Sequence, residues 1–482
     1  MPFTSLDFTL FLGLVLLLNW RLKAMITPYP AFLLVASLVF YFLGAPKFLP
    51  LLVIVGLANW FTARQMRPDV LASRRKLYLI ADITFCLSLL GFFKYFEFFV
   101  ITIDGLGFNV QGLLNLPDIV YPVGQSFFTF QGLSLAIDRY RRPDSNPPTI
   151  VETLLFVSFF PTVLSGPIQR FEPFMGQFKK KLPSPEDLNM ALVLILSGLF
   201  KKIAMSSYLS EHIVRGVFQV PESYSFLGVL AGIYGYSAQI YLDFSGYSDL
   251  AQGIGLLIGF DVGQNFQSPY LTTNIRDFWR RWHISLSTWL RDYLYFPLGG
   301  SKKGSRFVNL LITQTLGGLW HGAHLRYIVW GFVHGLLLAI THQYRDRKLR
   351  LERAWKVIGF KSWQRPKPRW VRSKKFLCFL LTFNFVSFTW ILFRAESFHR
   401  AKDIFKLSID PFRAGLGAPL MAWLLVFLTL LAQRYGEGLK QIFFNVQAKM
   451  SIPVLSLWCA LWVIIIIKLG PAGVLPFIYF QY

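Results

Sequence analysis

The chain has 482 residues, of which 54% are hydrophobic and 17% aromatic, while only 15% are charged. Soluble domains carry charge on about a quarter of their residues, so this composition excludes an ordinary soluble protein. The net charge is +24, from 49 Lys and Arg against 25 Asp and Glu. In a membrane protein such an excess reflects basic cytoplasmic connectors, so nucleic acid is not an expected partner.

Long apolar runs recur from one end of the chain to the other, and several are long enough to cross a bilayer. The first run lacks a basic n-region and a small-x-small cleavage motif, so we interpret it as a spanning helix and not as a cleaved signal. The sequence therefore predicts an all-α polytopic membrane protein embedded in the lipid bilayer. The runs cover residues 8–20, 31–45, 48–61, 77–93, 150–168, 188–200, 224–242, 325–340, 376–393, 418–432 and 452–469.

Basic residues cluster in the short connectors between these runs, which the positive-inside rule places in the cytoplasm. The most basic connector, 345–375, has 13 Lys and Arg against two acids. Segment 101–120 has no Lys or Arg and is expected on the opposite side. Because Arg21 and Lys23 follow the first run, the N-terminus is predicted to be extracytoplasmic.

We expect one integral membrane domain spanning 1–482, with N-terminal helices over 1–240 and C-terminal helices over 376–482. Residues 241–340 are predicted to form the core, and 345–375 a basic cytoplasmic loop with helices at the membrane interface. The core begins with a stretch rich in polar and aromatic residues, which includes Asp243 and Asn265. Polar backbone at membrane depth is tolerated only where protein buries it or where it lines a watery cavity. This stretch therefore predicts short helices and re-entrant segments around a cavity.

A dense block of charged and aromatic residues at 276–293 reads RDFWRRWHISLSTWLRDY. On a continuous helix, Asp277 would pair with Arg281, and Trp279 would lie beside His283, because residues four apart share a face. An interfacial anchor, with Trp in the aromatic belt and Arg reaching the headgroups, is one interpretation. The gathering of His, Ser and Asp among them favours a functional cavity.

His321 lies in the apolar, glycine-rich sequence GGLWHG at 317–322. Glycines allow close approach of backbone or ligand, and Trp320 can wall a pocket. Histidine is the usual general base for taking a proton from a hydroxyl. Ionisable groups at membrane depth are unfavourable, so His321 and His283 are the leading functional candidates.

Metal binding and transport are the two alternatives to catalysis on a hydroxyl. His324 and His334 follow His321, but the sequence has no carboxylate at a ligand spacing, no HExxH motif and no Cys pair, so a metal is not expected. The residues fit transfer of a group to a hydroxyl. They also fit a proton-coupled transporter or flippase for an acyl donor or a lipid-linked sugar, although the polar groups gather in one block and not in paired halves.

Several motifs in order resemble the membrane-bound O-acyltransferase family, and most closely its bacterial branch typified by alginate O-acetyltransferase. The resemblance covers roughly residues 1–400 and is densest over 241–335. Its main carriers are residues 278–295, the sequence PLGG at 297–300 and the sequence GGLWHG around His321. It implies a bundle of about 11 to 13 transmembrane and re-entrant helices around a central tunnel, in a bacterial inner membrane.

The resemblance also implies roles for individual residues. His321 corresponds to the catalytic base, and His283 to the second catalytic position. Acetyl-CoA is the expected co-substrate, no cofactor is permanently bound, and an extracytoplasmic SGNH-type partner relays the acyl group to a polysaccharide. The CoA phosphates are expected near Arg291, Lys302, Lys303 or the 345–375 loop. The residues expected to line the tunnel or bind substrate are Trp279, Arg280, Arg281, Trp282, Ser287, Asp292, Gly317, Gly318, Trp320, Asp243 and Asn265.

Overall fold

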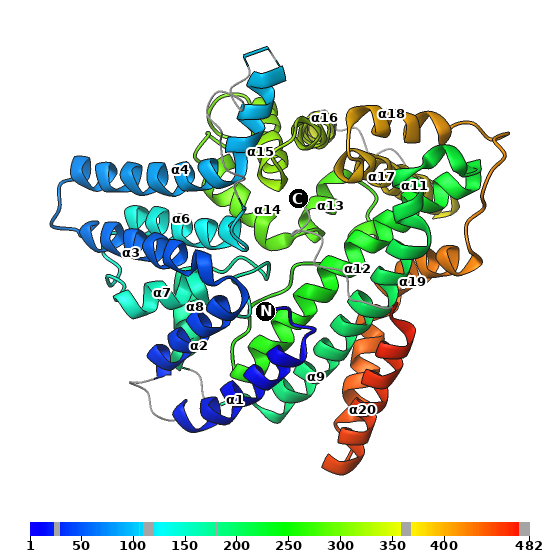
Figure 1. Ribbon diagram of the computed structural model, residues 1–482. Coiled ribbons are helices and arrows are strands. Elements are labelled where there is room, and N and C mark those ends of the chain that lie inside the picture. Colours follow the sequence, from blue (N-terminus) through cyan, green and yellow to red (C-terminus); the bar gives the residue numbers. More distant parts are fainter. Residues whose placement is uncertain (24–28, 106, 109–119, 180–181, 358–367, 472–482) are drawn as a thin grey trace.

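A computed structural model describes residues 1–23, 29–105, 107–108, 120–179, 182–357 and 368–471, and the chain in these ranges is almost entirely helical (Figure 1). They contain no β-strand, only an isolated bridge between Tyr224 and Leu416. The α-helices are α1 (Leu6–Leu22), α2 (Tyr29–Gly44), α3 (Leu49–Gln65), α4 (Ala72–Gly105), α6 (Gln125–Arg141), α7 (Ile150–Ser158), α8 (Phe171–Gly176), α9 (Pro185–Leu199), α10 (Ser207–Leu209), α11 (Arg215–Gln219), α12 (Phe226–Ile258), α13 (Ile275–Arg281), α14 (Ile284–Leu290), α15 (Arg306–His321), α16 (Leu325–Val357), α17 (Pro368–Arg394), α18 (Phe398–Leu407), α19 (Leu420–Gln447) and α20 (Ile452–Leu469).

Short helices of other types connect them. The π-helical segments are η3 (Phe200–Ser206), η4 (Ser210–Val214) and η7 (Arg291–Tyr295). The 3₁₀ turns are η1 (Pro46–Phe48), η2 (Gln177–Lys179), η5 (Pro221–Ser223) and η6 (Pro269–Leu271).

Among the described residues, six helical segments are long and apolar enough to cross a membrane. The protein is therefore an all-α multi-pass membrane protein, which confirms the predicted fold class. The expected spans at 224–242 and 418–432 lie within α12 and α19, which are longer helices that also carry polar residues. The six segments are Pro46–Gln65, Ala72–Asp104, Pro185–Gln219, Leu325–Arg353, Ser373–Arg394 and Ile452–Leu469.

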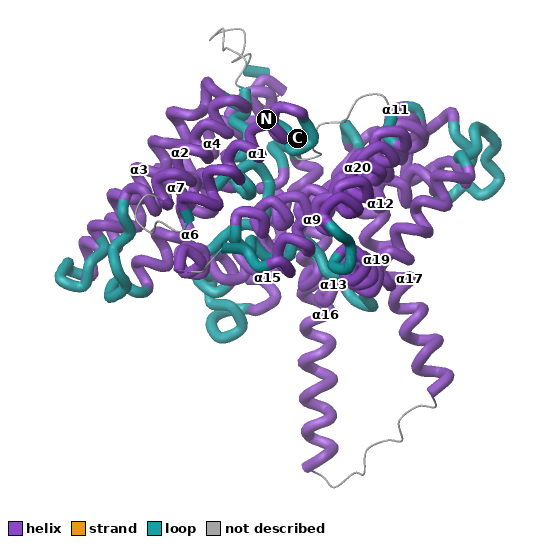
Figure 2. Tube along the Cα trace, turned by 90° about the horizontal axis from the view of Figure 1, so that it is seen from below, coloured by secondary structure: helices purple, strands orange, loops and turns teal. Residues whose placement is uncertain are grey.

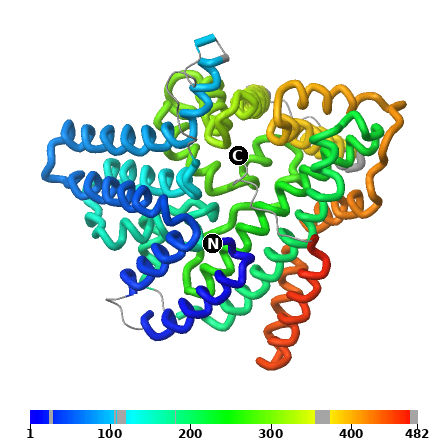
Figure 3. The backbone as a smooth tube through the Cα atoms, viewed as in Figure 1, coloured from blue at the N-terminus to red at the C-terminus, as the bar shows by residue number. Residues whose placement is uncertain are grey.

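The fold has two flanks around a central helix. The N-terminal helices α1 to α7 gather on one side and the C-terminal helices α17 to α20 on the other, as the colour gradient of Figure 3 shows. Between them runs α12, a 33-residue helix that packs against α9, η3, α17 and α19. Most of its side chains are buried, so α12 forms the central wall of the molecule.

The contacts of α12 explain its position. It crosses α9 closely, because a Cβ on Gly246 would lie only 2.9 Å from the carbonyl oxygen of Gly198. It ends at Gly259, whose φ of +90° is a left-handed conformation that favours glycine. Lys23, at the end of α1, donates to the carbonyl oxygens of Ile258 at 2.9 Å and Gly259 at 3.2 Å. A cation at the C-terminus of a helix is favourable, so Lys23 holds α1 against the end of α12.

The stretch predicted as a basic loop is helical at both ends. α16 continues to Val357 and α17 begins at Pro368, and the two helices project together from the body of the molecule (Figure 2). Residues 358–367 between them lie outside the described residues, as do most of segment 101–120, Lys180, Lys181 and residues 472–482.

Candidate active site

The two candidate histidines come from separate elements and meet at one indole ring. His321 is the last residue of α15, and His283 lies between α13 and α14, two helices that are near the middle of the view in Figure 1. The Trp320 ring centroid lies 4.9 Å from that of His321 and 6.1 Å from that of His283. His283 has 0% exposure and His321 has 5%. The pairing that was predicted from the sequence is therefore a buried arrangement around Trp320.

His283 occupies a break in the dense block and not a continuous helix. α13 ends at Arg281, and His283 has φ 42° and ψ 58°, a left-handed conformation that is strained for a residue with a Cβ. Consequently, Trp279 and His283 do not lie on one continuous helix, and the expected i, i+4 helical arrangement was wrong. The break turns the chain, so that the His283 ring packs edge-on against Phe244 of α12 at 4.6 Å.

Asn265 stabilises this turn from outside the block. Its carbonyl oxygen accepts the amide of Ile284 at 3.0 Å, and its side-chain oxygen accepts the amide of Ser285 at 3.1 Å. Its side-chain nitrogen donates to Ser248 Oγ of α12 at 3.4 Å. Asn265 therefore ties α12 to the first turn of α14, beside His283.

The carboxyl end of α15 is held by two residues of α4. The Lys94 ammonium donates to the carbonyl oxygen of Trp320, and the Tyr95 hydroxyl donates to that of Leu319 at 2.9 Å. The Lys94 Nζ also lies 5.5 Å from the centroid of the Trp320 ring, a cation–π contact.

Sequence reasoning missed Lys94 and Tyr95. The signal was present, because Lys94 directly follows the apolar run 77–93, and an ionisable residue within a spanning helix is a functional candidate. Their partners, however, lie more than 220 residues away in the chain. A single sequence does not reveal such a contact.

The glycines before His321 allow two helices to cross closely, as the sequence predicted. A Cβ on Gly318 would lie 2.9 Å from Gly331 Cα, so α15 and α16 meet backbone to backbone. Gly317 faces Leu290 of α14 instead. The close crossing brings Trp330 of α16 to 5.3 Å from the His321 ring, and Phe393 of α17 lies at 5.2 Å. The imidazole therefore sits among aromatic faces.

The other histidines of this region have structural contacts. A ring nitrogen of His334 lies 2.8 Å from Thr389 Oγ1, and both residues are buried. His324 accepts from the backbone amide of Arg326 at 3.4 Å. Among the residues that the structure describes, no group of three or more His, Cys, Asp or Glu side chains could hold a metal ion.

The arginines of the dense block differ in their surroundings. Asp277 pairs with Arg276 at 3.1 Å and with Arg280 at 3.7 Å, so the expected Asp277–Arg281 pair is replaced by these two contacts. The Arg280 side chain is 66% exposed, and Arg281 is half-buried. By contrast, Trp279 and Trp282 are buried, and their rings lie against Trp330 at 5.7 Å and Trp390 at 5.1 Å.

Asp292 has its contacts in a charged cluster. It lies 3.6 Å from Arg170 and 2.7 Å from Arg291, and its carbonyl oxygen accepts from Arg141 at 3.0 Å. Lys302 and Lys303 are exposed on the turn after η7. Arg291, Lys302 and Lys303 are the residues that were expected near the CoA phosphates.

Asp243 and Ser287, two further predicted residues, bind other parts of the protein. Asp243 forms a buried ion pair with Lys202 of η3 at 2.5 Å. The Ser287 hydroxyl donates to the carbonyl oxygen of Trp282 at 3.1 Å, which closes the end of α13.

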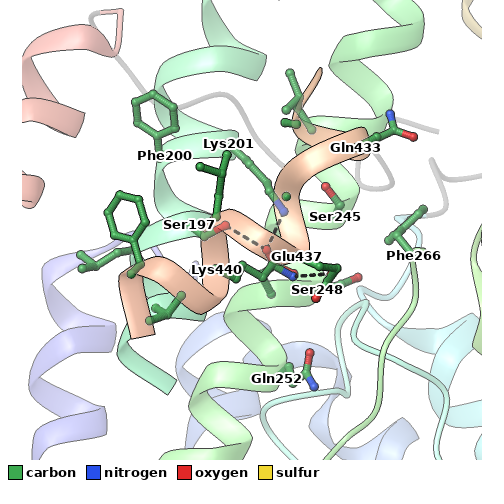
Figure 4. Close-up of a pocket in the computed structure, with 18 of the residues that line it drawn as sticks. Ser197, Phe200, Lys201, Ser245, Ser248, Gln252, Phe266, Gln433, Glu437 and Lys440 are labelled. Atoms are coloured by element: carbon green, nitrogen blue, oxygen red, sulfur yellow. Dashed lines mark hydrogen bonds and ion pairs between the residues drawn. The ribbon is translucent and has the colours of Figure 1, made fainter. Parts of the chain in front are cut away.

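A cavity of about 290 Å³ lies beside the histidine turn, between α9, η3, α12, α19 and α20 (Figure 4). Asn265 and Phe266 line it, whereas neither His283 nor His321 is among the described residues that do. Phe266 packs against Phe244 at 5.0 Å and Trp282 at 5.1 Å, so these rings separate the cavity from His283.

Comparison with known proteins identifies the class to which this architecture belongs. The sequence profile of the membrane-bound O-acyltransferase family matches residues 139–350, which include both histidines. The chain is 36% identical to the probable alginate O-acetylase of Pseudomonas putida, over 84% of this chain and 78% of that protein. It is 34% identical to the peptidoglycan O-acetyltransferase of Helicobacter pylori, over 78% and 72% of the two chains. It is 28% identical to the teichoic acid D-alanyltransferase of Bacillus subtilis, over 58% and 69%.

The chain belongs to the membrane-bound O-acyltransferase family. It is a multi-pass membrane enzyme that transfers acyl groups to oxygen, which confirms the predicted class of enzyme and favours it over a transporter or flippase.

Proposed function

We propose that this enzyme moves an acetyl group from cytoplasmic acetyl-CoA to a hydroxyl of an extracytoplasmic polysaccharide, directly or through an SGNH-type partner protein. Relatives named for O-acetylation of alginate and of peptidoglycan support acetyl transfer to a polysaccharide. The observation that carries the proposal is the burial of His321 beside Trp320 and His283, inside a chain of apolar helices. The bacterial inner membrane is the expected location.

In this mechanism His321 is the general base. Its imidazole takes the proton of the acceptor hydroxyl, and the oxygen attacks the carbonyl carbon of the thioester. The carbon–sulfur bond then breaks, and the imidazolium returns the proton to the departing thiolate, which leaves as free CoA. His283, across Trp320, orients the acceptor. Lys94 holds the end of α15 and places a positive charge near the oxyanion that forms during the attack.

The donor is expected to bind on the basic side of the molecule. Arg291, Lys302 and Lys303 are its expected contacts, and the projecting ends of α16 and α17 carry further basic residues (Figure 2). Phosphate groups bind Arg and Lys through charge-assisted hydrogen bonds.

Replacement of the base tests the proposal. His321→Ala should lower the release of free CoA from acetyl-CoA by at least about 100-fold in membranes supplied with acceptor, because general-base catalysis contributes about 10² to 10⁴ in rate. His399→Ala is the matched control, since this side chain is 86% exposed and pairs with Asp403 in α18. Both variants should reach the membrane in wild-type amounts. Near-normal CoA release by His321→Ala would exclude this residue as the base.

A further inference from the structure

The cavity shown in Figure 4 lies beside a helix that faces lipid. α20 packs against α9 and η3, and only 6% of its apolar window is buried. Trp462 of α20 closes the cavity on that side, with its ring 5.6 Å from Phe443 of α19 and 6.1 Å from Phe200 of η3. In a membrane enzyme the exposed face of α20 contacts acyl chains, so the cavity is one helix away from the bilayer.

The charges that line the cavity balance one another. Lys201 pairs with Asp249 at 2.6 Å, and Lys440 lies 3.5 Å from Glu437 one turn earlier on α19. Ser197 adds a hydrogen bond to Asp249 at 3.2 Å. The Lys201–Asp249 pair is mostly buried and fixed. The Glu437 carboxylate is 77% exposed and Lys440 22%, so this second pair is the one that a ligand can reach.

Two buried amides also line the cavity with polar atoms that lack partners. Gln447 is 2% exposed, and within the part of the chain that the structure describes neither atom of its amide has a hydrogen-bond partner. Gln433 is 6% exposed; its oxygen accepts the amide of Tyr270 at 2.9 Å, while its nitrogen has no partner among the described residues. Buried amides are normally hydrogen-bonded, so a polar group that enters the cavity beside them would complete their bonding.

We infer that this cavity binds a zwitterionic phospholipid of the phosphatidylethanolamine type, at a site separate from the acyl-transfer centre. Lys440 offers a donor to the phosphate, and the amide of Gln447, about two turns further along α19, offers a donor to the ester oxygens. Glu437 offers an acceptor to the ammonium group. The balanced charge favours a zwitterion over an anionic lipid, since a net negative headgroup would place unpaired charge beside Asp249 and Glu437.

Lipid retention by the purified full-length chain tests this inference without acetyl-CoA, so the result is independent of the acyl-transfer mechanism. The protein is delipidated in detergent, incubated with dioleoyl-phosphatidylethanolamine or dioleoyl-phosphatidylglycerol, and analysed by native mass spectrometry. The wild type should retain the ethanolamine lipid at least about tenfold more strongly than the glycerol lipid. Equal or stronger retention of phosphatidylglycerol would overturn the inference.

Variants locate the binding at the cavity. The double variant Glu437→Gln with Lys440→Gln should lose about tenfold in phosphatidylethanolamine retention, and Gln447→Leu should also weaken it. Lys449→Gln is the control, because Lys449 is exposed just beyond α19 and outside the lining. Unchanged retention in the double variant and in Gln447→Leu would refute the site, and thermal unfolding of each variant checks that the fold persists.

Discussion

The histidine centre and the ion pairs between α12 and η3 both place ionisable side chains inside a membrane protein, but different contacts hold them. Around His283 and His321, aromatic rings, a strained turn and backbone hydrogen bonds set the positions. Along α12, the Lys202–Asp243 and Lys201–Asp249 pairs join charged groups directly to one another. The ion pairs thus link charged helices directly, whereas the two imidazoles are held among aromatic rings, as the proposed mechanism requires.

The largest effect should come from breaking one ion pair. Asp243→Ala removes one side of the buried Lys202–Asp243 pair, which should destabilise the protein by about 3 to 5 kcal/mol. Thermal unfolding of the purified protein measures this change. The double variant Asp243→Ala with Lys202→Met should recover most of the stability, because both charges of the buried pair are then replaced by apolar groups. If Asp243→Ala unfolds at the wild-type temperature, the pair has no architectural role.

Changes at His283 should affect activity more than stability. His283→Gly fits the left-handed turn, so the fold should persist, while acyl transfer falls by about 100-fold because the acceptor is no longer oriented. His283→Val should lower stability as well, by about 1 to 2 kcal/mol, because a branched side chain disfavours positive φ. Activity and unfolding are measured on the same preparations. Full activity in the glycine variant would mean that His283 only shapes the turn.

Lys94 shares a feature with both regions: it is ionisable, like the ion-paired lysines, but its partner is a backbone carbonyl of the histidine centre. Lys94→Met should lower kcat by about tenfold with little change in the KM for acetyl-CoA, because the cation acts in the transition state. Lys94→Arg should restore most of the rate. Lys76→Met, on the exposed first turns of the same helix, is the control. A rise in KM alone would contradict this role.

The smallest effect is expected on the basic surface. Replacing both Lys302 and Lys303 by Gln should raise the KM for acetyl-CoA about threefold without changing kcat, and the difference should shrink at high salt. Lys402→Gln, which is exposed on α18, serves as the comparison. An unchanged KM at low salt would mean that Lys302 and Lys303 do not contact the donor phosphates.

Much of the fold could be predicted from the sequence, because apolar runs and basic connectors carry local signals. The close approach of α15 to α16 at Gly318 could also be predicted, since only glycine permits the two backbones to touch there. The break at His283 was not, because the residue in the left-handed turn is not a glycine and the block reads as one helix.

Contacts between residues distant in sequence could not be predicted either. Asp292 was expected to line the tunnel or bind substrate; besides neighbouring Arg291 its contacts are with Arg170 and Arg141, which are brought there by the chain before α8 and by α6. Asn265 was expected to line a tunnel; it lines the cavity and also braces the turn at Ile284 and Ser285. These contacts depend on tertiary packing, which hydrophobic periodicity does not encode.

The bond from Lys23 to the end of α12 has a consequence for how the protein is made. Lys23 and Ile258 are 235 residues apart, so the ribosome must synthesise the whole of that stretch before α1 can dock. At about 5 to 20 residues per second, the first helix waits roughly ten seconds or more in the bilayer without its final neighbour. Biogenesis of this enzyme therefore includes a long-lived, partly assembled intermediate, in which the N-terminal flank is inserted before the central wall exists.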